Sequence, residues 1–173
     1  MPDAAPTLRP MHANDAQAVL AIYAGGIATG HATFEERPPE WAEWDAGHLT
    51  ACRLVAEDGG TVLGWAALSP VSGRCVYGGV AEVSVYVAPE ARGRGVGRLL
   101  LARLVEDAEA VGIWTLQAGI FPENTGSVEL HRKAGFREVG LREGLGKMGF
   151  GPMAGQWRNV LLLERRSVTV GRE

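Results

Sequence analysis

The sequence has few cysteines and no long apolar run. Only Cys52 and Cys75 are present, so neither a disulfide framework nor a four-ligand zinc site is expected, and a reducing compartment suits both thiols. No apolar stretch approaches roughly 18 residues, and no charged-then-apolar leader begins at Met1, so we expect no membrane span and no secretion. These features predict a cytoplasmic protein without a structural metal.

The sequence also lacks a marked excess of either acidic or basic residues. The chain has 17 Lys and Arg against 20 Asp and Glu, a net charge of −3, whereas a broad nucleic-acid surface needs a basic patch. With 173 residues, 46% of them hydrophobic, the chain can bury one core. No repeat or composition break divides it. We therefore expect a single domain over residues 7–165, with a flexible N-terminal tail at 1–6 and a C-terminal tail at 166–173.

Apolar periodicity predicts strands and helices in alternation, as in α/β chains. The clearest strand covers residues 80–87, and Pro89 ends it. Asn14 is the expected cap of the first helix, Asp58-Gly59-Gly60 indicates a hairpin turn, and residues 143–155 are expected to form a glycine-rich loop. The other expected strands cover residues 7–9, 53–56, 62–68, 114–121 and 157–163, with a further strand entered at Gly135-Phe136, and the other helices cover residues 38–49, 96–111 and 125–134.

Glycine is abundant, with 24 residues, about twice the usual share of 7%. The densest group reads Arg92-Gly93-Arg94-Gly95-Val96-Gly97-Arg98, between the strand at 80–87 and a long helix. Glycines at such a junction let successive backbone N–H groups point into one concavity, and the helix adds the positive end of its dipole. The segment predicts a phosphate or pyrophosphate site. A tight turn with solvated arginines is the alternative.

The glycine spacing excludes the two commonest nucleotide loops. A dinucleotide turn requires Gly-x-Gly-x-x-Gly, but the last position holds Arg98 counted from Gly93, or Leu100 counted from Gly95. The acidic residue expected about 20 positions later is missing as well, because Ile113 stands there. A nucleoside-triphosphate loop requires Gly-x-x-x-x-Gly-Lys-Ser/Thr, and the sequence has no such run.

Two motifs in this order resemble the GCN5-related N-acetyltransferase (GNAT) family. The family signature Gln/Arg-x-x-Gly-x-Gly/Ala is matched by Arg92-x-x-Gly95-x-Gly97, and Asn124-x-x-Ser127-x-x-Leu130-His131 fits a second motif. The run from Ala81 to Val87 is similar to the phosphinothricin and methionine sulfoximine acetyltransferase branch. The resemblance covers nearly the whole chain and implies the GNAT fold, an α/β domain with a mixed, mostly antiparallel central sheet flanked by helices.

The resemblance also implies acetyl-CoA as the acetyl donor. In such enzymes the strand before the glycine turn splays from its neighbour and leaves backbone groups for pantetheine. Transferred to this sequence, the pantetheine arm would lie along Val85, Tyr86 and Val87. The pyrophosphate would be wrapped by Gly93, Arg94, Gly95, Val96, Gly97 and Arg98, and the far side of the cofactor would contact Asn124.

Glu82 is the expected catalytic residue. Strand alternation places Glu82, Ser84 and Tyr86 on one face, and a carboxylate inside an otherwise apolar strand is costly unless it is paired or faces a cavity. From the residues alone, a solvated sheet face is the alternative. The resemblance implies that Glu82 takes a proton from the substrate ammonium, directly or through water. The free amine then attacks the thioester, with backbone amides of the strand stabilising the oxyanion.

Two other reactive side chains have simpler interpretations. His131 stands where the broad family often has a tyrosine that protonates the departing thiolate, and cofactor contact or helix packing is the favoured interpretation for it. Cys75 precedes the strand at 80–87 without an identifiable histidine partner, and direct transfer needs no covalent intermediate.

The acceptor is expected beside Glu82. Arg74 offers a two-pronged donor for a substrate carboxylate, and Phe34 is a candidate wall on the other side. The branch tends to show Trp-Arg-x-Phe before the strand, whereas this chain has Val71-Ser72-Gly73-Arg74, so a different small amine or amino acid is also an expected acceptor. The expected acceptor contacts are Ser72, Gly73, Arg74, Glu82, Val83 and Ser84.

The resulting hypothesis is an N-acetyltransferase acting on a small amino-acid-like amine, of the phosphinothricin, methionine sulfoximine or methionine sulfone type. The resemblance also implies a homodimer, which the sequence itself does not show. Two alternatives stay open at this point: acetylation of a protein or peptide amine, and a CoA-binding sensor without catalysis.

Overall fold

The computed structural model describes residues 5–172 and confirms the expected α/β fold, a seven-stranded mixed sheet flanked by helices. Its strand order is β1-β2-β3-β4-β5-β7-β6, and the pairing is antiparallel except between β4 and β5. The strands are β1 (Thr7–Pro10), β2 (Leu54–Asp58), β3 (Thr61–Pro70), β4 (Val80–Val87), β5 (Thr115–Ile120), β6 (Arg137–Lys147) and β7 (Trp157–Arg166). The helices are α1 (Ala16–Ile27), α2 (Trp41–Gly47), α3 (Val96–Ala110) and α4 (Thr125–Lys133).

Helices cover both faces of the first half of the sheet. A Cβ on Gly64 of β3 would lie 3.1–3.2 Å from Leu100 and Val96 of α3, so α3 packs on that face. The neighbouring Trp65 points to the opposite face, where its ring stacks on Tyr86 at 4.9 Å and meets Trp44 of α2 edge-on at 5.4 Å. The buried apolar residues of both layers form one main core around the sheet. No helix among residues 5–172 is long and apolar enough to cross a bilayer.

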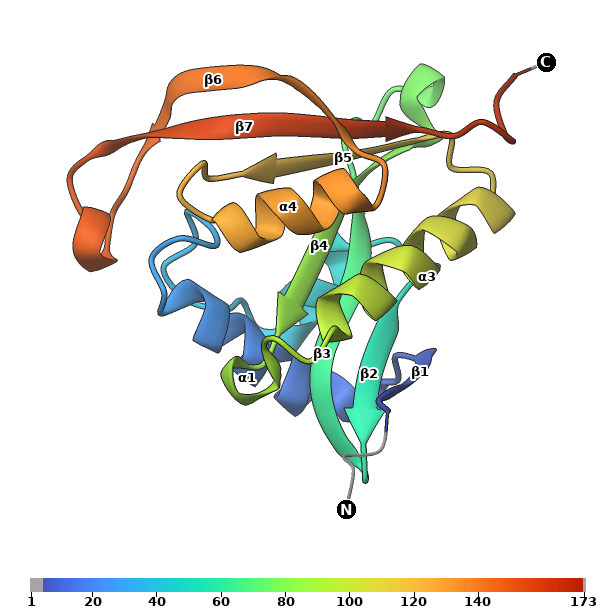
Figure 1. Cartoon of the computed structure of the whole chain (residues 1–173), viewed down its shortest axis with the longest axis horizontal. Coiled ribbons are helices and arrows are strands. Elements are labelled where there is room, and N and C mark those ends of the chain that lie inside the picture. Colours follow the sequence, from blue (N-terminus) through green and yellow to red (C-terminus); the bar gives the residue numbers. More distant parts are fainter. Residues whose placement is uncertain (1–4, 173) are drawn as a thin grey trace.

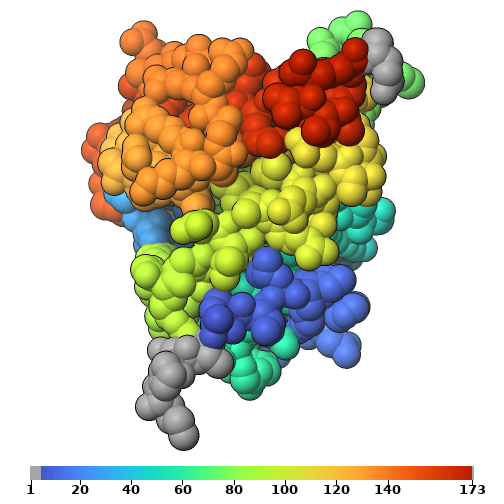
Figure 2. All heavy atoms as spheres, turned by 45° about the vertical axis from the view of Figure 1, so that its right-hand side comes forward, coloured from blue at the N-terminus to red at the C-terminus, as the bar shows by residue number. Residues whose placement is uncertain are grey.

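Strands β5, β7 and β6 form the second half of the sheet, which lies across one end of the first half (Figure 1). Figure 1 shows the β6–β7 hairpin running across one end of the molecule, with α4 beneath β5 and β7. A smaller apolar cluster fills this end, built on Phe121, Met148 and Val160 with Phe34 packed against it. In Figure 2 the orange and red C-terminal elements lie at one end, α3, in yellow-green, crosses the middle, and the dark-blue N-terminal elements lie toward the opposite end.

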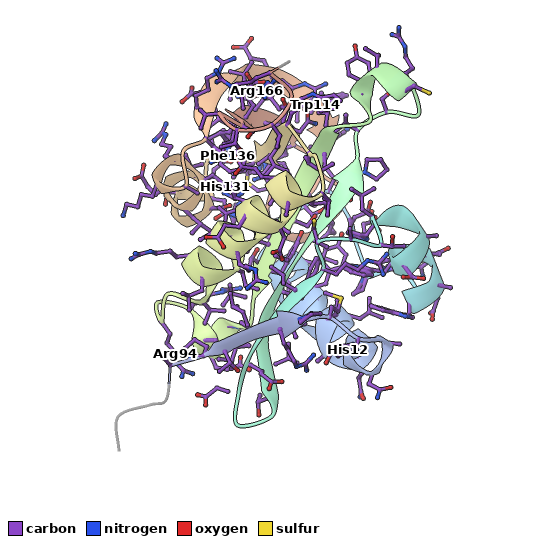
Figure 3. The ribbon with its side chains drawn as sticks, turned by 90° about the vertical axis from the view of Figure 1, so that its right-hand side faces the viewer. His12, Arg94, Trp114, His131, Phe136 and Arg166 are labelled. Atoms are coloured by element: carbon purple, nitrogen blue, oxygen red, sulfur yellow. The ribbon has the colours of Figure 1, made fainter. Side chains whose placement is uncertain are left out.

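The chain end folds back on the sheet. Arg166 closes β7, and its guanidinium donates to the carbonyl oxygens of Val170 at 2.8 Å and Trp114 at 3.3 Å. Figure 3 shows Arg166 and Trp114 side by side at this end. These contacts fasten residues 167–171 beside the start of β5.

Two local predictions are wrong. Asn14 does not cap α1, because it lies within a 3₁₀ turn, Ala13–Asp15, and the helix begins at Ala16. The carboxylate of Asp15 there accepts from the backbone N–H of His12 at 2.7 Å and from Arg9 at 2.8 Å. The expected loop at 143–155 starts too early, since β6 continues to Lys147. An irregular register between Arg142 and Gly146 absorbs the glycine-rich stretch while pairing with β7 resumes beyond it.

Candidate active site

A cavity of about 1050 Å³ lies where β4 and β5 part. Its walls come from the edge of β4, the glycine turn, the end of β5, the start of α4 and the segment that follows α1. Segments far apart in the sequence therefore enclose one space of the size that ligand sites usually have. The cavity walls include Glu82, Val83, Ser84, Val85, Tyr86, Val87, Gly93, Gly95, Val96, Gly97, Arg98 and Asn124.

The parallel pairing of β4 and β5 is short. It runs from Val80–Thr115 to Glu82–Gln117, while β4 remains paired with β3 as far as Val87. Within the described residues the two strands have no register beyond Glu82, so one backbone edge of β4 from Val83 to Val87 borders the cavity. Unpaired strand edges present N–H and C=O groups that an extended ligand can use. The expected splay of the strand is confirmed.

The glycine turn has the conformation that only glycine adopts without strain. Gly93 and Gly95 have φ of 77° and 79°, and Gly95 is the residue before the first turn of α3. A Cβ at either position would meet nothing within 4 Å, so the space around them is open. At Gly97 a Cβ would lie 3.3 Å from Leu130 and 3.5 Å from Val87. The turn thus brings the N-terminus of α3 to the cavity wall, where an anion is favoured.

The three arginines of this turn are not equivalent. Arg92 and Arg98 line the cavity. Arg94 donates from Nη2 to Asp58 Oδ2 at 3.0 Å, which ties the turn to the β2–β3 hairpin; Figure 3 shows it at the end of the molecule away from His131. Of the three arginines, Arg92 and Arg98 therefore belong to the cavity wall, and Arg94, which was also expected at the pyrophosphate, is not among the lining residues.

Asn124 begins α4 and also joins it to the opposite wall. Its Oδ1 accepts from the N–H of Ser127 at 3.3 Å, a helix N-cap. Its Nδ2 donates to the carbonyl of His31 at 3.2 Å. Asn124 therefore holds together two sides of the cavity that are 93 positions apart in the chain.

Glu82 lies where β4 and β5 diverge. Its side chain is exposed toward the cavity, and its Oε2 accepts from Gln117 Nε2 at 2.9 Å. Within residues 5–172, the second carboxylate oxygen of Glu82 accepts no hydrogen bond from the protein. One oxygen is thus fixed by an amide while the other stays accessible, the arrangement that a proton acceptor requires.

Tyr86 forms the part of the cavity wall that faces α1. Its ring packs against Tyr23 at 4.8 Å, and its hydroxyl interacts with those of Tyr23 and Thr33. Burial raises the pKa of Tyr86 far above its usual range, and burial likewise raises the pKa of Tyr23. Both phenols therefore remain protonated, and the cluster anchors the segment that follows α1 to β4.

His131 is a packing residue on α4. It is 4% exposed, and its ring meets Phe136 edge-on at 5.1 Å, the pair labelled in Figure 3. Its Nδ1 donates to the carbonyl of Ser127 at 2.7 Å, so the neutral ring carries its proton there and has none on Nε2. Burial lowers the pKa of His131. This geometry supports helix packing and not proton donation to a leaving group.

The loop before β4 lies apart from this cavity. Ser72, Gly73 and Arg74 are not among its lining residues; the Arg74 guanidinium instead lies 5.6 Å from the Tyr77 ring, on the exposed side of the loop. Cys75 is exposed in the same loop. Within one chain, the structure therefore brings Glu82, Val83 and Ser84 together and leaves the three loop residues outside.

Several residues in or beside the cavity wall belong to no sequence motif. Gln117 was not identified, because only the register of β5 against β4 places it beside Glu82. His31, Glu123 and Phe121 come from two connections without a motif. Arg158 does have a sequence signal, because it is a charged residue inside the apolar strand at 157–163.

Comparison with known proteins assigns a family to this arrangement. Residues 15–136 match the model of the acetyltransferase (GNAT) family. The chain is 39% identical to phosphinothricin N-acetyltransferase of Alcaligenes faecalis, over 92% of this chain and 81% of that protein. It is 33% identical to L-methionine sulfoximine/L-methionine sulfone acetyltransferase of Pseudomonas aeruginosa, over 87% and 88%. The crystal structure of a phosphinothricin acetyltransferase from Sinorhizobium meliloti in complex with AcCoA superposes with a TM-score of 0.81 at 32% identity, covering 97% of this chain and 96% of that one.

Proposed function

The chain belongs to the acetyltransferase (GNAT) family, and from this premise we propose that it acetylates the amino group of a small amino-acid-like acceptor. It is an acetyltransferase, and its acetyl donor is acetyl-CoA. The observation that carries the proposal is the position of Glu82, at the point where β4 and β5 part, with the glycine turn at the other end of the same β4 edge.

The residues present suit the donor. The open glycines at 93 and 95 and the N-terminus of α3 form a cradle for the pyrophosphate, with Arg92 and Arg98 adding positive charge. The backbone edge from Val83 to Val87, which is not paired with β5, would hold the pantetheine arm by hydrogen bonds. When bound, acetyl-CoA supplies a thioester whose acetyl group an amine can accept.

Glu82 acts as the general base. An amino-acid amine is protonated near neutral pH, so a proton must leave before the nitrogen can attack a carbonyl. The Gln117 amide orients the Glu82 carboxylate, which takes that proton directly or through one water. Backbone N–H groups along the β4 edge stabilise negative charge that develops on the acyl oxygen.

The acceptor enters from the side of the segment that follows α1. This wall presents Phe34, His31 and Glu35 to the cavity, a mixture of apolar and polar groups suited to a short polar amino acid. The relatives are named for phosphinothricin and for methionine sulfoximine and sulfone. We assign the same acceptor class to this chain.

The assignment predicts a homodimer as well. Large apolar side chains of the β6–β7 hairpin are exposed, which is typical of an interface. These side chains are Val139, Leu141, Leu145 and Trp157. Sedimentation of the purified chain tests the prediction.

The function is tested by CoA thiol release from acetyl-CoA with phosphinothricin, methionine sulfoximine, methionine sulfone, the other natural amino acids and a short peptide. We expect saturable release with one of the first three and none with N-acetylated methionine sulfone, the matched control without a free amine. CoA release with the peptide and with no small amino acid would show that the acceptor is a protein or peptide amine. Saturable acetyl-CoA binding without release on any amine would indicate a sensor.

A further inference from the structure

Arg158 is a buried cation at the start of β7, where it is the second residue of the strand. It is 1% exposed, and its guanidinium donates to the carbonyl of Gly30 at 2.9 Å, to Nδ1 of His31 at 3.0 Å and to Glu123 Oε2 at 3.3 Å. The same group lies 3.9 Å from the centre of the Phe121 ring. A guanidinium keeps its charge under all ordinary conditions, so its burial must be offset by such contacts.

These contacts join segments that the chain order keeps far apart. Gly30 and His31 belong to residues 29–37, here called the acceptor segment, which follows α1 and lines the cavity through His31 and Phe34. They lie 128 and 127 positions from Arg158. Glu123 directly precedes Asn124, whose own amide holds the carbonyl of His31. Hydrogen bonds from the Arg158 guanidinium therefore hold the acceptor segment against β7.

The acceptor segment packs closely on the β6–β7 hairpin because the hairpin has glycines, without side chains, at the two contact positions 146 and 149. A Cβ on Gly146 would lie 2.8 Å from the Phe34 ring, and one on Gly149 would lie 2.2 Å from Glu36 Oε1. Gly146 is the partner of Arg158 across β6 and β7, so both residues present the same sheet face. Phe34 rests on that face and meets Phe121 edge-on at 4.9 Å.

We propose that Arg158 is the positioning residue of the acceptor wall. It holds the turn at Gly30 and His31 against β7, and so fixes Phe34 and His31 at the cavity without touching the reacting atoms. Its hydrogen bond also assigns the tautomer of His31, because a nitrogen that accepts from a guanidinium carries no proton and leaves the N–H on Nε2. The inference rests on the proposed function for what enters the cavity, but the positioning itself does not depend on the acceptor.

Steady-state kinetics of Arg158→Met distinguish a positioning role, which affects the acceptor KM alone, from a general loss of structure, which affects both KM values. Methionine keeps most of the apolar stem and loses the forked donor. We expect the acceptor KM to rise about tenfold or more, as for a reactant displaced by roughly 1 Å, while the acetyl-CoA KM changes less than about twofold, since the side-chain contacts of Arg158 are with Gly30, His31, Phe121 and Glu123 and not with the glycine turn. Arg137→Met removes an exposed arginine paired with Glu164 on the neighbouring strands and is the control. Equal changes in both KM values, or none, would overturn the proposal.

Arg158→Lys covers the case in which Arg158→Met does not fold. Lysine keeps the buried charge but cannot bond two acceptors in the planar geometry of the fork. We expect an acceptor KM between those of the wild type and Arg158→Met, with the acetyl-CoA KM unchanged. A wild-type acceptor KM in Arg158→Lys would show that charge alone suffices and would reject the fork as the positioning element.

Amide hydrogen exchange tests the positioning without any acceptor. In Arg158→Met, we expect faster exchange in peptides covering residues 28–37 and unchanged exchange in those covering 80–98. Unchanged exchange at 28–37 would overturn the proposal even if kinetics shift. If the wild type acetylates no small amine, the proposed function fails, and this experiment still decides the role of Arg158.

Discussion

The two sides of the cavity are built in different ways. The donor side consists of β4, the glycine turn and the N-terminus of α3, which are continuous in sequence from Val80 to about Arg98. The acceptor side consists of residues 29–37, the β6–β7 hairpin and the β5–α4 connection, joined by Arg158 and Asn124 across more than 90 positions. The donor side works mainly through backbone groups and the acceptor side through side chains. Substitutions should therefore separate the two sides by their effects on donor and acceptor.

Gly97→Glu should give the largest effect, confined to the donor. A side chain at Gly97 would start 3.3 Å from Leu130 and carry a negative charge into the wall assigned to the pyrophosphate. Like charges in contact cost several kcal/mol, so acetyl-CoA affinity should fall by about 100-fold or more. Isothermal titration calorimetry on the folded variant measures this. Gly140→Glu, where a Cβ meets nothing within 4 Å, is the control; normal affinity in Gly97→Glu would remove the turn from the site.

Glu82→Gln should reduce turnover and spare binding on the donor side. The change keeps the shape and the contact region of Gln117 but removes the proton acceptor. Turnover should fall by about 10²-fold, the usual scale for lost general base catalysis, with acetyl-CoA affinity unchanged by calorimetry. Glu138→Gln, an exposed carboxylate paired with Arg132, should behave as wild type. Full turnover in Glu82→Gln would exclude Glu82 as the base.

Gly146→Val should affect the acceptor side alone. Its Cβ would overlap the Phe34 ring at 2.8 Å and push that wall away from the hairpin. We expect the acceptor KM to rise severalfold, up to about tenfold, and the acetyl-CoA KM to stay within about twofold. Gly140→Val on the same strand is the matched control. A rise in the acetyl-CoA KM of the same size would show that the two sides are not separable.

His131 should show the smallest effect, on stability and not on chemistry. Burial lowers its pKa below the ordinary value of 6.5, so below that pH the unfolded chain takes up a proton that the folded chain does not. The contribution is thus present above pH 6.5 and is lost as the pH falls toward the folded-state pKa. Urea unfolding at pH 7.5 and 5.5 should show a larger loss of stability for the wild type than for His131→Gln. Equal losses would contradict the burial argument.

The sequence predicted the donor side well because its information is local. The strand at 80–87 has the predicted bounds, and the predicted glycine turn follows it, with Gly93 and Gly95 at positive φ directly before α3. Glu82 was singled out by a carboxylate inside an apolar strand together with the family resemblance, and the structure places it on the cavity wall, while its role as the base stays a prediction. Local signals were weaker where backbone pairing overrides propensity, as in β6, which continues through Gly144 and Gly146.

By itself, the sequence determined the fold class, the glycine turn and the strand that carries Glu82, because periodicity, turn chemistry and motif spacing act within a few residues of one another. Only the tertiary structure decided that Gln117 meets Glu82, that Ser72, Gly73 and Arg74 lie outside the cavity, and that Arg158 supports Gly30 and His31. These relations depend on strand register and on contacts across 35 to 128 positions. Such contacts form only when the whole sheet has closed around its core, and no short pattern in the chain records them.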